Sequence, residues 1–144
     1  MYLLLRWDWL NKMLPEIEDI EANFSFLEDW EDKYRYLIEL GEGLAPFPDA
    51  YRTEEYKVDG CMSQVWLYPT CAQDGVYTLQ ADSDALIVKG LIAIILSAYS
   101  GKNKEQIKAV PIEQIFENLG LATHLSPTRR NGFFAMVEKI RRLP

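Results

Sequence analysis

Histidine and cysteine are scarce in this chain of 144 residues, which has one histidine and two cysteines. Disulfide frameworks need several cysteine pairs, and zinc sites need Cys and His at short, regular spacings. Cys61 and Cys71 are instead separated by a strand-like stretch, and His124 is distant from both in the sequence. If that stretch is extended, the two cysteines are too far apart to bridge. We therefore expect neither a disulfide nor a metal site, and free thiols indicate a cytoplasmic protein.

Positive charge is also in short supply. The chain carries 15 Lys and Arg against 22 Asp and Glu, a net charge of −7. Because nucleic-acid binding depends on clustered basic side chains, this balance argues against a nucleic-acid partner. The acidic groups concentrate between Glu16 and Asp32. A solvated helix face explains them most simply, and the alternative is a surface that steers a basic partner.

Long hydrophobic runs are missing as well. The most apolar stretch, residues 84–99, contains Lys89 and is shorter than the roughly 20 residues that span a bilayer. A helix of this kind, apolar on nearly all sides, is typical of the centre of a core. We expect no membrane association.

The first twelve residues are apolar and aromatic, but Arg6 and Asp8 interrupt them and no small-residue cleavage site follows. They therefore do not form a signal peptide pattern. We interpret residues 1–12 as an N-terminal extension, with Met13 as the native start. The length and the absence of a linker predict a single domain over residues 13–144.

Short strands and amphipathic helices account for most of the remaining pattern. Alternation of apolar and polar residues predicts strands at about residues 55–58, 64–68 and 76–81, with Asp74-Gly75 as the second hairpin turn. Helical periodicity predicts helices at about residues 15–23, 25–41, 84–99, 102–109, 112–119 and from 126 onward. The fold class is therefore α+β, a small three-stranded antiparallel sheet packed against several helices.

Several helix ends have recognisable capping residues. Ser25 and Glu28 have the spacing of a capping box, and Gly41 is placed to end the helix that follows. Ser126, followed by Pro127, predicts the start of the last helix.

Cys61 follows an Asp59-Gly60 pair that lies between two β-favouring runs. Such a pair indicates a tight turn, so Cys61 should lie at or beside its tip. Gly60 has no side chain, which lets a second backbone or a substrate approach closely. A thiol in that position can be presented to a partner. The alternative is a small buried hydrophobe, as most free cysteines are.

Residues 60–66, Gly-Cys-Met-Ser-Gln-Val-Trp, resemble the Gly-Cys-x-Ser-Gln-Val-Trp signature of the SufE family, sulfur acceptors in iron–sulfur cluster assembly. Similar blocks occur in the same order at residues 30–41, 81–91 and 124–129. The likeness covers nearly the whole chain, from about Met13 to Arg142. The family often has glutamine where Met62 stands.

The resemblance implies a SufE/IscU-like fold and a sulfur-transfer accessory protein rather than a stand-alone enzyme. Cys61 would receive a persulfide sulfur from a cysteine desulfurase of the SufS or CsdA type, which it would also activate. It would then pass the sulfur to an iron–sulfur scaffold. Pyridoxal phosphate would belong to the desulfurase, and no cofactor is expected in this chain.

The resemblance also marks residues of the loop and of the partner-binding surface around Cys61. In the loop they are Gly60, Met62, Ser63 and Gln64. Elsewhere in the chain they are Asp82, Asp84, His124 and Arg129. Each of the latter has a plainer interpretation: helix capping for the two aspartates, pairing with one of them for Arg129, and a structural hydrogen bond for His124.

A sulfur acceptor works best with some thiolate at neutral pH, so a group that lowers the pKa of Cys61 would be useful, although the sequence does not give that pKa. Lys57, Arg129 and the N-terminus of the helix at residues 84–99 are the candidates. With its partner absent, Cys61 should rest against apolar surface, and the loop should swing outward on docking.

Other functions remain open from the residues alone. The chain could be a regulatory module that activates a desulfurase without carrying sulfur. Cys61 and His124 could form the nucleophile and base of a thiol hydrolase. An accessible Cys61 could also act as a redox sensor.

Overall fold

The structure, a computed structural model, describes residues 14–144. Our interpretation of residues 1–12 as an extension, and of Met13 as the native start, lies outside the described residues. The elements run in this order: α2 (Ile17–Phe26), α3 (Trp30–Glu42), the 3₁₀ turns η1 (Asp49–Tyr51) and η2 (Glu54–Tyr56), β1 (Val65–Cys71), β2 (Val76–Ser83), α4 (Leu86–Tyr99), β3 (Lys102–Asn103), α5 (Lys104–Ala109), α6 (Ile112–Asn118) and α7 (Pro127–Arg141).

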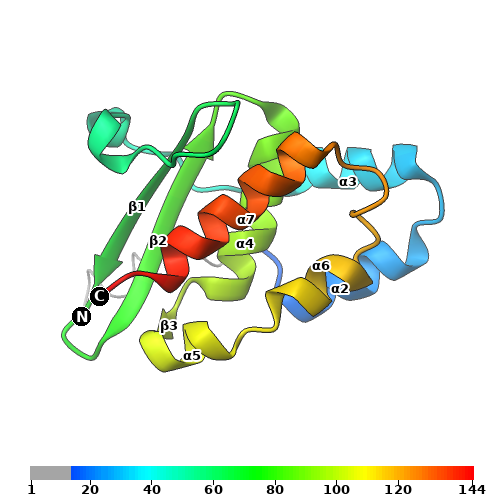
Figure 1. The fold of residues 1–144 in the computed structure, drawn as a ribbon. Helices are drawn as coiled ribbons and strands as arrows, with labels where there is room; N and C mark the ends of the chain where they lie inside the picture. The colour runs from blue at the N-terminus through cyan, green and yellow to red at the C-terminus, as the bar shows by residue number, and fades with distance from the viewer. Residues whose placement is uncertain (1–13) are drawn as a thin grey trace.

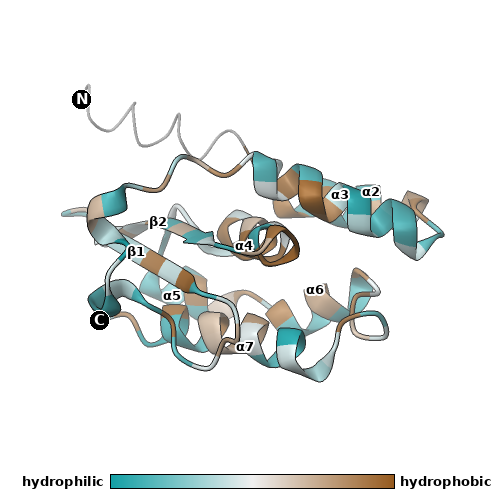
Figure 2. Ribbon diagram, turned by 90° about the horizontal axis from the view of Figure 1, so that it is seen from above, coloured by the Kyte–Doolittle hydropathy of each residue, from teal (hydrophilic) through white to brown (hydrophobic). Residues whose placement is uncertain are grey.

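The helix α4 lies at the centre of the molecule. Figure 2 shows α2 and α3 on one side of it and α5, α6 and α7 on the other, with the sheet beside it. It packs against α3, β2 and α7, and most of its residues are buried. The predicted core helix is therefore confirmed. Within residues 14–144, no helix is both long and apolar enough to cross a membrane.

The sheet confirms the α+β fold class, although one of its strands is not where the sequence pattern put it. The strand order is β1-β2-β3, antiparallel throughout, and the register runs from Val65 opposite Ser83 to Cys71 opposite Tyr77. A turn at Gly75, with φ +85°, joins β1 to β2 as expected.

Residues 55–58 were predicted as a strand, and this prediction is wrong. Glu54–Tyr56 form a 3₁₀ turn, and only Lys57 bridges to Trp66. The alternation covered too few residues, and Tyr56 packs edge-on against Tyr68 instead of extending the ladder.

The third strand is Lys102–Asn103, where a helix was expected to begin. Asn103 forms a capping box with Gln106 and starts α5 one residue later. Because a residue at an N-cap has extended backbone, Lys102 and Asn103 are free to pair with β2.

Two of the three predicted helix caps are wrong. Ser25 lies inside α2, where its hydroxyl donates to the carbonyl of Ala22 at 2.6 Å, so it forms no capping box with Glu28. Gly41 lies inside α3, which ends at Glu42 with Gly43 as its C-cap. The third cap is confirmed, since Ser126 Oγ accepts the N–H of Arg129 at 3.2 Å.

Position 41 of α3 is a glycine because the backbones of α3 and α4 are in direct contact there. A Cβ on Gly41 would lie 2.9 Å from the amide nitrogen of Gly90, and a Cβ on Gly90 would overlap the carbonyl oxygen of Leu37. The glycines therefore serve a close helix crossing, which sequence periodicity cannot distinguish from a helix end.

Replacing Gly90 with alanine tests this crossing, because the sign of the change in the free energy of unfolding differs from that in an ordinary helix. In an ordinary helix, Gly→Ala raises stability by about 0.5–1 kcal/mol. Here we expect Gly90→Ala to lower the free energy of unfolding by about 2 kcal/mol, because α3 has to move away. Urea denaturation measures it, and a stabilised variant would contradict the close crossing.

Candidate functional site

The Cys61 loop, residues 59–64, joins the Lys57–Val58 segment to β1. Val58 N–H donates to the carbonyl of Val65 at 2.8 Å and closes the base of the loop. Gly60 has φ +89°, a conformation that favours glycine. The predicted turn is therefore present with Cys61 near its tip, although the loop is wider than a two-residue hairpin turn.

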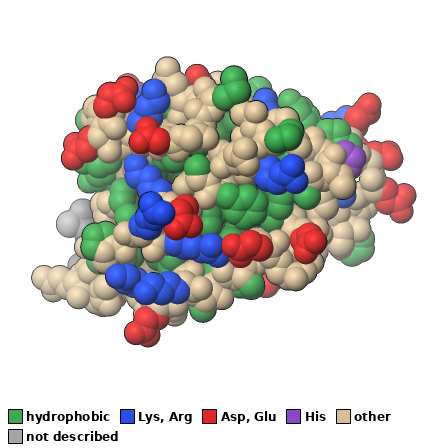
Figure 3. All heavy atoms as spheres, viewed as in Figure 1, with side chains coloured by type: hydrophobic (Ala, Val, Ile, Leu, Met, Phe, Trp, Pro, Cys, Tyr) green, Lys and Arg blue, Asp and Glu red, His purple; other side chains and the backbone are tan. Residues whose placement is uncertain are grey.

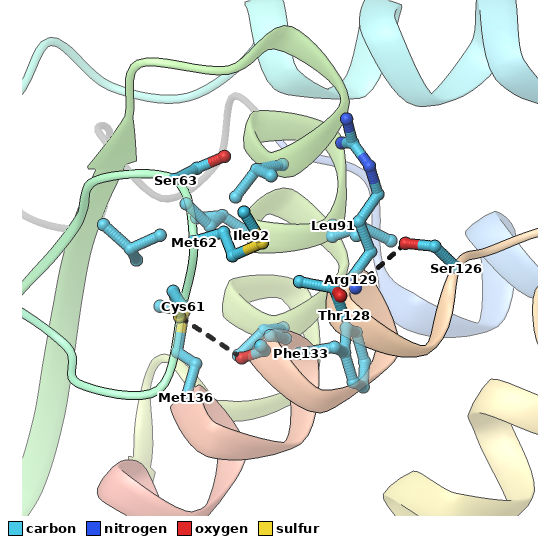
Figure 4. A pocket seen from close by; sticks show the side chains of 14 residues that line it. Cys61, Met62, Ser63, Leu91, Ile92, Ser126, Thr128, Arg129, Phe133 and Met136 are labelled. Carbon is cyan, nitrogen blue, oxygen red and sulfur yellow. Dashed lines mark hydrogen bonds between the residues drawn. The ribbon is translucent and has the colours of Figure 1, made fainter.

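Cys61 is half-buried and packs against the hydrophobic core. Its Sγ lies 3.7 Å from the carbonyl oxygen of Gly132 on α7, to which the thiol donates (Figure 4). This confirms the expectation that the thiol rests on apolar surface when no partner is present.

A cavity of about 360 Å³ opens beside the thiol. Its walls come from α4 and α7, whose apolar side chains line it together with the loop: Val88, Leu91, Ile92, Ile95, Phe133 and Met136. Polar groups lie around it on Ser63, Ser126, Thr128 and Arg129. The predicted site residues Cys61, Met62, Ser63 and Arg129 thus meet at one cavity.

Burial raises the pKa of the Cys61 thiol, and the Asp59 carboxylate raises it further. While the loop lies against α7, the pKa of Cys61 is therefore raised and not lowered. Lys57, one of the candidates for lowering this pKa, has its ammonium 3.9 Å from the carboxylate of Glu54. A thiol that has left water keeps its proton because the charged form is poorly solvated there.

Asp84 fixes the end of the Cys61 loop. Its Oδ1 accepts the N–H of Gln64 at 3.1 Å, and its own N–H donates to the carbonyl of Gln64 at 3.3 Å. The helix α4 begins after Ala85 without a side-chain cap. Asp84 therefore positions the loop instead of capping the helix.

Asp82 is buried and belongs to a different contact. Its carboxylate lies 2.7 Å from the guanidinium of Arg52 and 3.6 Å from the ammonium of Lys89. Arg52 also lies over the ring of Trp66, 5.3 Å from the centroid. Neither helix capping nor pairing with Arg129 accounts for Asp82, and nothing in the sequence pattern pointed to Arg52.

His124 lies away from the thiol. Its ring stacks on that of Trp30 with centroids 4.6 Å apart and an angle of 12°. Figure 3 shows it at the edge of the molecule, among acidic side chains. His124 is not among the residues that line the cavity in the described chain. The Cys61–His124 pair of a thiol hydrolase is therefore not formed.

Met62 and Cys71 both present their side chains to solvent. Met62, next to the half-buried thiol, is 86% exposed. Cys71 is exposed at the other end of β1, and both cysteines are free. No cluster of three or more His, Cys, Asp or Glu residues that could hold a metal ion occurs within residues 14–144.

Sequence reasoning missed the part that α7 plays. Gly132 and Met136 lie against the Cys61 loop, and nothing in their local sequence distinguishes them from other residues of an amphipathic helix. Only the packing of α7 beside α4 brings them to the thiol.

The raised pKa predicts the pH dependence of Cys61 alkylation. In the Cys71→Ser variant, the iodoacetamide rate should rise with pH to a midpoint above the usual range of a cysteine thiol, since only the thiolate reacts. Asp59→Asn should move that midpoint down, because it removes a repelling charge. A midpoint below the usual range would contradict the packing of Cys61 against α7.

Comparison with known proteins supplies the family. The family model SufE, described as "Fe-S metabolism associated domain", matches residues 18–143. A SufE-like protein of Rhizobium meliloti is 44% identical over 131 residues, 89% of this chain and 94% of that protein. A SufE-like protein of Rhizobium etli is 45% identical over 131 residues, 89% of this chain and 88% of that protein.

A solved structure shows the same fold. The solution structure of a hypothetical protein from Thermus thermophilus matches with a TM-score of 0.69 and 20% identity, over 89% of this chain and 92% of that one. With residues 18–143 matched by the family model and two relatives above 40% identity, the chain belongs to the SufE family of Fe–S metabolism.

Proposed function

We propose that this protein accepts sulfur on Cys61 from a cysteine desulfurase of the SufS or CsdA type, activates that enzyme, and delivers the sulfur to an iron–sulfur scaffold. One observation carries the proposal: a free thiol near a turn tip rests beside an apolar cavity of about 360 Å³. The cavity can take an added sulfur atom without rearrangement of the core. Membership of a family associated with Fe–S metabolism supports the same function.

The transfer step needs little beyond the thiol. The Cys61 thiolate attacks the outer sulfur of the donor persulfide, the S–S bond of the donor breaks, and the donor cysteine leaves as a thiolate. A new S–S bond forms on Cys61, so atoms and charge balance and no external oxidant is consumed. The release of sulfur from free cysteine, with its pyridoxal phosphate, belongs to the partner, and this chain contributes no cofactor.

The raised pKa of Cys61 suits a carrier that waits for its partner. While the loop lies against α7, the thiol keeps its proton and reacts slowly. Outward movement of the loop returns Cys61 to a polar setting, where the thiolate forms more readily. The apolar cavity then shelters the persulfide when the loop returns.

The loop can move at small cost. Among the described residues, no backbone N–H or C=O group of residues 59–63 makes a hydrogen bond to another element, and the thiol donates only to Gly132. The ends of the loop are held, by Val58 with Val65 on one side and by Asp84 on the other. Outward movement therefore exposes the Cys61 side chain and leaves the sheet intact.

Mass spectrometry tests the proposal directly. After incubation with a desulfurase of the SufS or CsdA type and cysteine, the protein should gain the mass of one sulfur atom. Cys61→Ser should abolish the gain, and Cys71→Ser, at the exposed end of β1, should retain it. An unmodified Cys61 beside an active desulfurase would overturn the proposal.

The same variants separate sulfur transfer from regulation. If Cys61 carries sulfur, Cys61→Ser should remove the stimulation of desulfurase turnover, because the enzyme persulfide then has no acceptor. Steady-state sulfide or alanine release measures this. Full stimulation by Cys61→Ser would instead identify a regulatory module that carries no sulfur.

A further inference from the structure

One face of α7 runs along the hairpin that presents Cys61. Residues separated by three and four positions lie on the same side of a helix. The contacts run in antiparallel order: Gly132 against Cys61, Ala135 against Gly60, and Lys139 against Lys57. The hairpin tip is therefore attached to α7 at three successive points, with the thiol at one end and Lys139 at the other.

The contact made by Lys139 differs in kind from the other two. Its Nζ donates to the backbone carbonyl of Lys57 at 3.0 Å, in a half-buried position. No carboxylate of the described chain lies within 4.0 Å of this ammonium, as the ion pairs of residues 14–144 show. The carbonyl is thus its partner. A hydrogen bond from a charged donor is stronger than the weak thiol bond to Gly132 or the van der Waals contact at Ala135.

The position of this bond decides what it can control. The bond between Val58 and Val65 links the two limbs of the hairpin to each other, so it stays intact if the tip lifts from α7. The bond from Lys139 crosses from α7 to Lys57, just before the loop, so it fixes the limb of the hairpin from which the loop lifts. Gly60 lies close to Ala135: a Cβ built on Gly60 would be 3.3 Å from the Cβ of Ala135. Gly60 itself has no side chain that could strengthen the contact with α7.

We infer that Lys139 is a positioning residue that holds the base of the Cys61 loop against α7 and so sets how often Cys61 leaves its apolar cavity. Its bearing on sulfur transfer rests on the proposed function, whereas its control of thiol exposure does not. Lys139 touches neither Cys61 nor the cavity. It acts through the carbonyl of Lys57, four residues before the thiol.

Alkylation of the free protein tests this without a partner. In the Cys71→Ser background, Lys139→Met keeps the length of the side chain and removes the donor. N-ethylmaleimide should then modify Cys61 about tenfold faster at constant pH, because the open loop is more populated. Lys139→Arg, which can still donate, should return the rate to within about twofold of the parent. Lys108→Met, an exposed lysine of α5, is the matched control and should leave the rate unchanged.

Hydrogen exchange distinguishes positioning from a general structural role. Lys139→Met should speed exchange at Lys57 and Val58, whose N–H groups are hydrogen-bonded beside the Lys139 contact, and leave α4 as protected as before. Equal loss of protection in α4, or an unchanged alkylation rate, or no rescue by Lys139→Arg, would overturn the inference.

A third readout uses the desulfurase. While the Cys61 loop lies against α7, the thiol is not presented to the desulfurase. A more populated open loop should therefore lower the KM for this protein several-fold, with kcat changed less than twofold. A changed kcat with unchanged KM would overturn the role in transfer. Faster alkylation together with no sulfur on Cys61 would contradict the proposed function but not the positioning role of Lys139.

Discussion

The burial of one thiol against two helices is the constraint on which the site depends. Cys61 can sit beside the apolar side chains of α4 only because α7 passes close by, with a glycine at residue 132. The thiol is half-buried in that contact, which raises its pKa and favours the protonated form. The same contact is weak enough to break, because the loop backbone forms no ladder with the rest of the protein. Shelter and release therefore come from a single packing arrangement.

The rest of the fold supplies rigid walls for that contact. The crossing of α3 and α4 at Gly41 and Gly90 brings α4 to the centre, where its apolar residues form both the core and one side of the cavity. Figure 1 shows α7 lying across α4 beside the loop that leads into β1. Asp84 holds one end of this loop to the start of α4. A moving segment thus lies between fixed supports.

Local sequence signals were reliable where local chemistry decides the structure. Asp59-Gly60 predicted the turn because the conformation at Gly60 disfavours other residues, and Ser126 predicted the start of α7 because its hydroxyl reaches a free N–H of its own first turn. The signals failed where distant residues compete. Tyr56 packs against Tyr68 in place of forming a strand, and Gly41 meets another helix in place of ending its own. The pKa of Cys61 depends on the tertiary structure in the same way, since burial and the Asp59 carboxylate raise it.

The sequence alone determined the α+β class, the family and the identity of the cysteine at the turn, since each depends on residues that are neighbours along the chain. The tertiary structure decided the partners of several side chains: Arg52 with Asp82, Trp30 with His124, and Lys139 with the carbonyl of Lys57. These contacts join residues far apart in the sequence, and each side chain could have satisfied its charge or its apolar surface in several ways. Only the tertiary packing selects one partner, because it fixes which groups lie within reach of one another.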